Sequence, residues 1–203
     1  RTSAATIIIG KASPTLSWNG SQTLLYGQPL GAAQLNATTS IPGTFTYAPA
    51  AGTVLHRGSH TVQATFTPAD PANYSSGDGM ANLVTVLPAP LVVKADDSAK
   101  PFGAPLPVFT ASFAGFVNGD TPAALAGAPG FATSATPQSA IGTYPITVGG
   151  LSSNDYTIAF APGVLAVQQA ATSAAVSSSA NPSGVNQPVT LTANVSVTAP
   201  GAD

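Results

Sequence analysis

The histidines of this chain stand four residues apart, at His56 and His60. On a helix that spacing places two imidazoles on one face, where they could bind zinc. They occur, however, in "VLHRGSHTV", where Gly58 interrupts any helix and the pattern indicates a turn that leads into a strand. The chain has no Cys, and no carboxylate is close to the pair in sequence, so the ligand set is too small for zinc. We therefore expect no metal role for these histidines.

Aspartates in expected loops and strand ends could supply the hard oxygen ligands that calcium prefers. The candidates are Asp96, Asp97, Asp120 and Asp155, with Asp70 as a further turn residue. No dense D-x-D-x-D loop occurs, and a single Asp in a turn usually accepts hydrogen bonds from its own backbone. Two interpretations stay open: the aspartates cap turns, which is the favoured one, or they bind calcium at joints between domains. No other cofactor is expected.

The sequence offers no combination of residues that indicates catalysis. It lacks the G-x-S-x-G motif that exposes a nucleophilic serine. On a strand, the adjacent Asp96 and Asp97 would point to opposite faces, so they cannot act as the paired carboxylates of a glycosidase. Their expected role is to end a strand and to keep its edge soluble. We expect that the protein is not an enzyme.

The stretch "SFAGFVNGD" at Ser112–Asp120 is the best candidate for a binding loop. Exposed aromatic rings next to a polar turn can stack on a sugar or contact a protein. The residues that would carry such binding are Phe113, Phe116, Asn118 and Asp120. Recognition of a glycan or a surface protein through this loop is the alternative to a purely structural role.

The composition indicates an all-β protein. Hydrophobic residues make up 44% and charged residues 6% of the 203 positions, so each half of the chain can form a core. There are 20 Gly and 19 Pro but no Glu, and Thr and Val recur in the alternating runs typical of strands. The five basic residues are scattered and the net charge is −2, so no nucleic-acid partner is expected. Without a run of 18 apolar residues, no membrane insertion is expected either.

Several phrases recur in the same order along the chain. "YGQPL" at Tyr26–Leu30 and "FGAPL" at Phe102–Leu106 lie 76 residues apart, and "GVNQPV" begins a third version at Gly184. The other recurring features are a Gly before an alternating strand and an Asn-Tyr or Asp-Tyr pair: Gly58 and Gly142, Tyr74 and Tyr156. A period of about 80 residues suits one small sandwich domain.

The repeat therefore predicts tandem immunoglobulin-like β-sandwich domains. Residues 1–10 are expected to be the last strand of a preceding repeat or a lead-in strand, with complete domains at 11–88 and 89–168. Residues 169–203 are expected to start a further repeat with two strands, too few for a core of their own. This last segment is expected to be mobile, to pack on the neighbouring domain, or to pair with a sheet edge of another copy.

The repeated phrase has an expected role in folding. Gly27 and Gly103 should take backbone angles that other residues avoid, and the aromatic residue before each of them should plug the end of its sandwich. Tyr74 and Tyr156 resemble the tyrosine corner, in which the hydroxyl bonds back to the backbone, and we expect both rings to pack in a core.

Four phrases within residues 90–168 resemble the MBG-type Ig-like repeat of bacterial surface proteins: "ADDSAKPFGAPLP", "FAGFVNGDTPAAL", "GTYPITVGGLSSNDYTI" and "GVLAV". Residues 11–87 resemble a related bacterial Ig-like repeat through "LLYGQPLGAAQLNAT" and "FTPADPANY", and the tail "SSSANPSGVNQPVTLTANV" resembles the opening of a third. The resemblance implies β-sandwich modules of large, secreted, surface-anchored or adhesin-like proteins. It implies an extracellular location and neighbouring repeats of the same chain as partners. The low charge and the short linkers favour a spacer role, in which the chain holds a functional end away from the cell.

Overall fold

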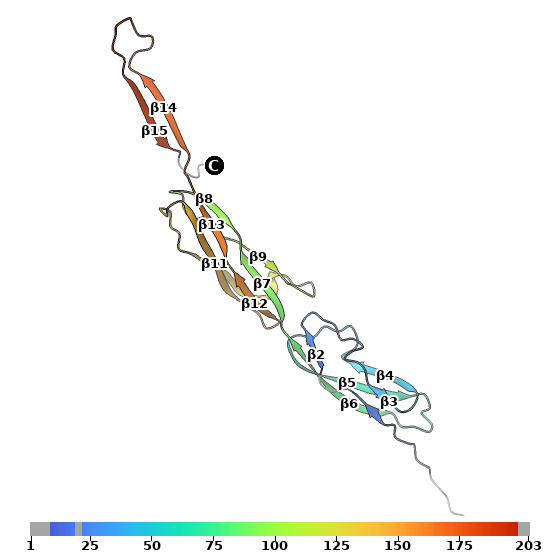
Figure 1. The fold of residues 1–203 in the computed structure, drawn as a ribbon. Coiled ribbons are helices and arrows are strands. Elements are labelled where there is room, and N and C mark those ends of the chain that lie inside the picture. The colour runs from blue at the N-terminus through green and yellow to red at the C-terminus, as the bar shows by residue number, and fades with distance from the viewer. Residues whose placement is uncertain (1–8, 19–21, 199–203) are drawn as a thin grey trace, which may run out of the picture. The chain divides into compact units, whose positions relative to one another are not determined.

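The computed structural model describes residues 9–18 and 22–198 (Figure 1). Over these residues the chain folds into strands, with one turn of 3-10 helix at Pro122–Ala124 and no α-helix. The predicted all-β class is confirmed. Within the described part of the chain, no helix is long and apolar enough to cross a membrane. The strand expected at residues 6–9 lies outside the described residues, apart from Ile9.

Two four-stranded sheets share one strand order. The first runs β2, β6, β5, β4 and the second runs β8, β13, β11, β10. The strands of the first are β2 (Gln22–Leu25), β4 (Gly43–Ala48), β5 (Gly58–Pro68) and β6 (Gly77–Leu87). Those of the second are β8 (Ser98–Pro101), β10 (Ala126–Thr133), β11 (Gly142–Ser152) and β13 (Gly163–Gln168).

The two sheets also share their register. β2 pairs with β6, and β8 with β13, in parallel, whereas β5–β6 and β11–β13 are antiparallel. Leu24 and Gly58 both lie opposite Val86 in the first sheet. Lys100 and Gly142 both lie opposite Val167 in the second. Residues of the two repeated phrases therefore occupy the same places in their sheets.

Three smaller sheets complete the structure. They pair β1 (Leu16–Ser17) with β3 (Thr38–Thr39), place β7 (Ala89–Ala95) between β12 (Tyr156–Ala161) and β9 (Ala111–Ala114), and pair β14 (Thr172–Ser178) with β15 (Leu191–Val197). The two strands expected in the tail are thus present, and they pair with each other. Every residue of both is exposed, as expected for a segment with too few strands for a core.

The chain forms two compact units, each described here by itself. Unit 1 comprises Arg1–Leu91, Gly115–Ala126 and Ser152–Ile158, and unit 2 comprises Val92–Ala114, Gly127–Leu151 and Ala159–Asp203. Unit 1 therefore contains three segments that the sequence places in the second predicted domain: residues 89–91, Gly115–Ala126 and Ser152–Ile158. The domain bounds drawn from the sequence period stay a prediction.

The core of unit 1 follows the alternation of its longest strands. In β5, Val62, Ala64 and Phe66 are buried while the residues between them are exposed, which confirms the face predicted for "HTVQATF". Val84 and Val86 of β6 complete this layer. The burial of such side chains is the main stabilising term for a small sheet.

The core of unit 2 includes a lysine. Ile146, Leu165 and Val167 are buried beside Lys100, whose side chain is only 3% exposed. The Lys100 Nζ donates hydrogen bonds of 3.0 Å to the carbonyl oxygens of Ala104 and Pro137. Two main-chain acceptors thus offset the cost of burying the ammonium group.

Candidate functional site

The site begins at the turn that follows β2. Gly27 has a φ of +88°, which confirms the backbone angle expected for it, and Gln28 N donates to Leu25 O. The Tyr26 backbone N donates to Leu87 O at 2.8 Å, which holds the turn against the end of β6. The Tyr26 side chain is only 4% exposed, so the first copy of the repeated phrase does bury its aromatic ring.

Two tyrosine hydroxyls meet on one carboxylate in unit 1. The Tyr26 hydroxyl donates to Asp120 Oδ2 at 3.0 Å, and the Tyr156 hydroxyl donates to the same oxygen at 2.7 Å. The two rings pack edge to face, with 5.4 Å between their centroids. We call Tyr26, Asp120 and Tyr156 the tyrosine clamp.

A tight turn positions the carboxylate of the clamp. Asp120 N donates to Val117 O at 3.0 Å, and Asn118 and Gly119 between them both have positive φ. Val117 N in turn donates to the Tyr156 hydroxyl oxygen at 3.1 Å. Tyr156 is buried and its hydroxyl does bond to the backbone, as expected, although that backbone lies 39 residues upstream.

Burial and charge keep both hydroxyls protonated. Burial, together with the hydrogen bond and negative charge of Asp120, raises the pKa of Tyr156 to about 12. The pKa of Tyr26 is also raised, first by burial and then by Asp120. A protonated hydroxyl can donate to a carboxylate, whereas a tyrosinate would repel it. The clamp is therefore intact throughout the neutral range.

The loop that carries Asp120 also closes over Gly27. A Cβ atom built on Gly27 would lie 2.5 Å from the Val117 side chain, far inside van der Waals contact. Only a glycine allows this approach, because any other residue would displace Val117. Tyr26 and Gly27 together form the seat for the 115–120 loop.

A second carboxylate, that of Asp155, lies beside the clamp. It accepts a hydrogen bond from Arg57 N at 2.8 Å, and its Oδ2 atom lies 2.8 Å from His56 Nδ1. The His56 ring stacks on Tyr26, with centroids 5.7 Å apart. Burial by itself would raise the pKa of Asp155, but the hydrogen bonds from Arg57 and His56 outweigh it and lower that pKa.

The histidines do not converge on a common point. His56 faces Asp155, and His60 Nε2 lies 2.7 Å from the main-chain oxygen of His56. Each ring thus has a partner within the protein. That these histidines have no metal role stays a prediction.

The aspartates considered as calcium ligands also accept hydrogen bonds from other groups of the protein. Asp96 accepts from the Thr110 hydroxyl, Asp97 accepts from Val164 N, and Asp70 accepts from Ala72 N and Asn73. Asp96 and Asp97 directly follow β7, where the sequence expects them to end a strand. Among the residues that the structure describes, no three acidic or histidine side chains gather where they could hold a metal ion. Calcium binding stays a prediction.

The predicted binding loop is directed partly inward. Phe116 packs edge-on against Tyr156 at 5.5 Å, and Phe113 lies half-buried in β9. Asp120 belongs to the clamp, which leaves Asn118 as the exposed member of the four candidates. The sequence shows that Phe113 and Phe116 are aromatic, but it does not show that Phe116 packs against Tyr156. It therefore does not predict that this loop takes part in the clamp.

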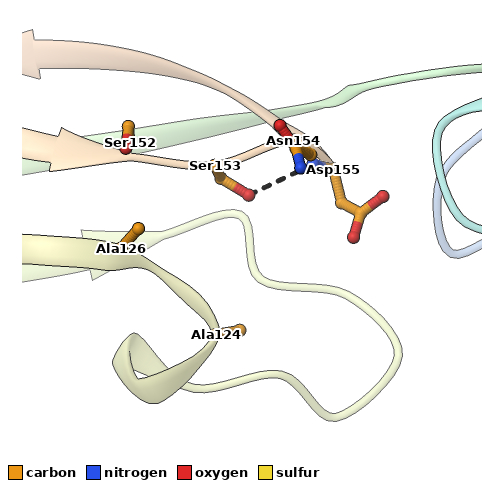
Figure 2. Close-up of a pocket in the computed structure, with 6 residues that line it drawn as sticks. All are labelled: Ala124, Ala126, Ser152, Ser153, Asn154 and Asp155. Atoms are coloured by element: carbon orange, nitrogen blue, oxygen red, sulfur yellow. Dashed lines mark hydrogen bonds between the residues drawn. The ribbon is translucent and has the colours of Figure 1, made fainter.

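An open hollow lies next to the clamp, and Figure 2 shows its lining of Ala124, Ala126, Ser152, Ser153, Asn154 and Asp155. The Ser153 hydroxyl accepts a hydrogen bond from Asp155 N at 3.2 Å. The Asp155 carboxylate is engaged by His56 and Arg57. The lining holds small and polar side chains.

Comparison with known families identifies one part of the chain. Residues 91–166 match the family model of the MBG domain (YGX type). The resemblance drawn from the sequence is thus confirmed for this part, which contains both Asp120 and Tyr156. A search of curated proteins gives no match to the chain.

Proposed function

We propose that this chain is a non-catalytic segment of tandem immunoglobulin-like β-sandwich modules. It acts as a spacer, or stalk, in a large bacterial protein that is secreted or anchored at the cell surface. The observation that carries the proposal is the agreement of strand order and register between the two four-stranded sheets. The MBG domain match at residues 91–166 supports a module of this kind.

The tyrosine clamp gives the spacer a physical basis. It ties Gly115–Ala126 and Ser152–Ile158, segments of the second predicted domain, to the end of β2 in the first. Free bending between successive modules would shorten the reach of a stalk. In our proposal the clamp keeps these segments folded as one body with the first sheet, so that the stalk does not bend within this unit.

Small-angle scattering of the full chain tests the spacer role. The maximum dimension should stay the same in calcium and in chelator, and Asp120→Ala should broaden the distribution of dimensions because both tyrosines lose their acceptor. Asp70→Ala is the matched control, since it removes an exposed turn carboxylate outside the clamp. A chain that shortens when calcium is removed would overturn the plain spacer in favour of calcium-stiffened joints.

A binding module is the second candidate function. The observations that favour it are the open hollow lined by Asn154 and, separately, the exposed Asn118 of the 115–120 loop. Binding of the chain to a glycan array, lost in Asn154→Ala and Asn118→Ala but retained in Asn36→Ala, would support this role. The absence of binding to glycans and to surface proteins would leave the spacer as the better account.

A further inference from the structure

The turn after β8 copies the turn after β2. Phe102 N donates to Gln168 O at 2.9 Å, just as Tyr26 N donates to Leu87 O at 2.8 Å. Gly103 has a φ of +86°, against +88° at Gly27. The backbone of the second turn therefore has the geometry on which the first turn accommodates a covering loop.

The two turns differ in what covers them. Val117 sits on Gly27, but nothing lies within 4 Å of a Cβ atom built on Gly103. Phe102 is 44% exposed where Tyr26 is buried, so the expectation that both aromatic rings plug their sheet ends is wrong for the second. The reason is that the ring needs a covering loop. Among the described residues, the 133–140 loop bonds to Gly103 N through Pro137 O but leaves the Phe102 ring exposed.

A second apolar side chain lies beside the open turn. Gly142 pairs with Val167, so the preceding Ile141 stands next to Gln168, whose oxygen binds Phe102 N. Ile141 is 59% exposed. We call Phe102, Gly103 and Ile141 the β8 end.

The chemistry of the β8 end differs from that of the β2 end. Phe102 lacks the hydroxyl with which Tyr26 binds Asp120, and Ala140 stands where the first sheet has His56. A carboxylate placed here would lose water without gaining these donors, which is unfavourable. Burial of the exposed Phe102 and Ile141 side chains would be favourable. The surface therefore suits an apolar loop and not a sugar or an acidic group.

We propose that the β8 end is the docking site for a loop of a further module of this kind, which places an apolar side chain on Gly103 as Val117 does on Gly27. This inference rests on the proposed tandem arrangement and identifies the contact that would join one module to the next. The contact would bury Phe102 and Ile141 without an acid–tyrosine bond. Successive joints along the chain would then be held by different chemistry.

The test uses the full chain with a second copy of residues 89–168 inserted after Gln168, and this copy carries Asp120→Ala because its carboxylate would find no hydroxyl donor at Phe102. Because the chain has no Cys, Ile141→Cys in the original copy gives a single thiol whose rate of maleimide labelling reports its exposure. Labelling should slow roughly tenfold when the inserted copy is present, since it then requires local opening. Val164→Cys, at an exposed position on β13, is the matched control and should label at the same rate with and without the insert.

A variant of the insert identifies the loop. Replacing the insert's counterpart of Val117 by Asp should restore the fast labelling of the thiol introduced by Ile141→Cys. An insert that folds, as judged by far-ultraviolet circular dichroism, but leaves the labelling rate unchanged would overturn the docking site alone. An insert that does not fold would overturn the modular function and the docking site with it.

Discussion

The ends of β2 and β8 carry the same phrase on the same backbone, yet one aromatic ring is buried and the other exposed. The turn geometry is local and is encoded twice. Burial depends on a loop that lies far away in sequence, and within the described residues such a loop covers the aromatic ring of the first turn but not that of the second. The repeated motif thus specifies the geometry of the turn, and a different part of the chain determines whether a loop covers that turn.

The neighbouring core position shows the same contrast in another form. Leu24 in β2 and Lys100 in β8 lie at the same register, and both are buried. Leu24 is apolar and needs only packing. The Lys100 ammonium instead binds the carbonyl oxygens of Ala104 and Pro137, so it fastens the turn after β8 to a separate loop.

The largest expected difference between the two ends concerns their glycines. Gly103→Ala should lower the free energy of unfolding by about 1–2 kcal/mol, because a side chain is strained at positive φ. Gly27→Ala should lower it by about 2–5 kcal/mol, since displacing Val117 adds an overpacking cost of about 1–3 kcal/mol. Urea unfolding of the two variants measures both values. Equal losses would mean that the 115–120 loop does not sit on Gly27.

Exchanging the aromatic residues tests the clamp from both sides. Tyr26→Phe should cost about 1.5–3 kcal/mol, the range for a hydrogen bond to a charged group. Phe102→Tyr should change stability by less than about 0.5 kcal/mol, as for an exposed substitution. Thermal and urea unfolding provide the comparison. A similar loss in both variants would show that the hydroxyl has no special partner at Tyr26.

Alkaline pH should weaken the clamped end. The folded pKa of Tyr156, about 12, lies above the ordinary value of about 10, so the unfolded chain loses this proton first. The stabilisation is complete below pH 10 and is lost as the pH rises towards 12. Urea unfolding as a function of pH should show this decline in the wild type and a smaller one in Tyr156→Phe. An unchanged slope in the variant would contradict the assignment.

The smallest expected effect lies at the acidic end of the pH range. Because the pKa of Asp155 is lowered in the folded state, its stabilisation is present above the ordinary pKa and is lost as the pH falls below it. The bond to His56 lies at the surface, so the loss should stay below about 1 kcal/mol. Asp155→Asn should flatten the dependence between pH 5 and pH 3, measured by urea unfolding at each pH, and a slope equal to that of the wild type would contradict this assignment.

Local features of the structure were predictable from the sequence, and long-range ones were not. The alternation in "HTVQATF" predicts the buried face of β5, and the repeated Gly predicts two turns with positive φ. The contact of Tyr26 with Asp120 spans 94 residues, and no period in the sequence indicates it. One signal that distinguishes the two copies is the hydroxyl, present in Tyr26 and absent in Phe102, but its role becomes clear only from the loop that covers Tyr26.

The parallel pairing of β2 with β6 and of β8 with β13 has a mechanical consequence. In each sheet an early strand lies beside the last one and runs in the same direction, with four residue pairs in register. Tension along the chain pulls such strands in opposite senses, so their hydrogen bonds are sheared together and do not peel apart one by one. Forced unfolding is governed by the unfolding rate, and this geometry makes extension slow even where the net stability of a module is modest.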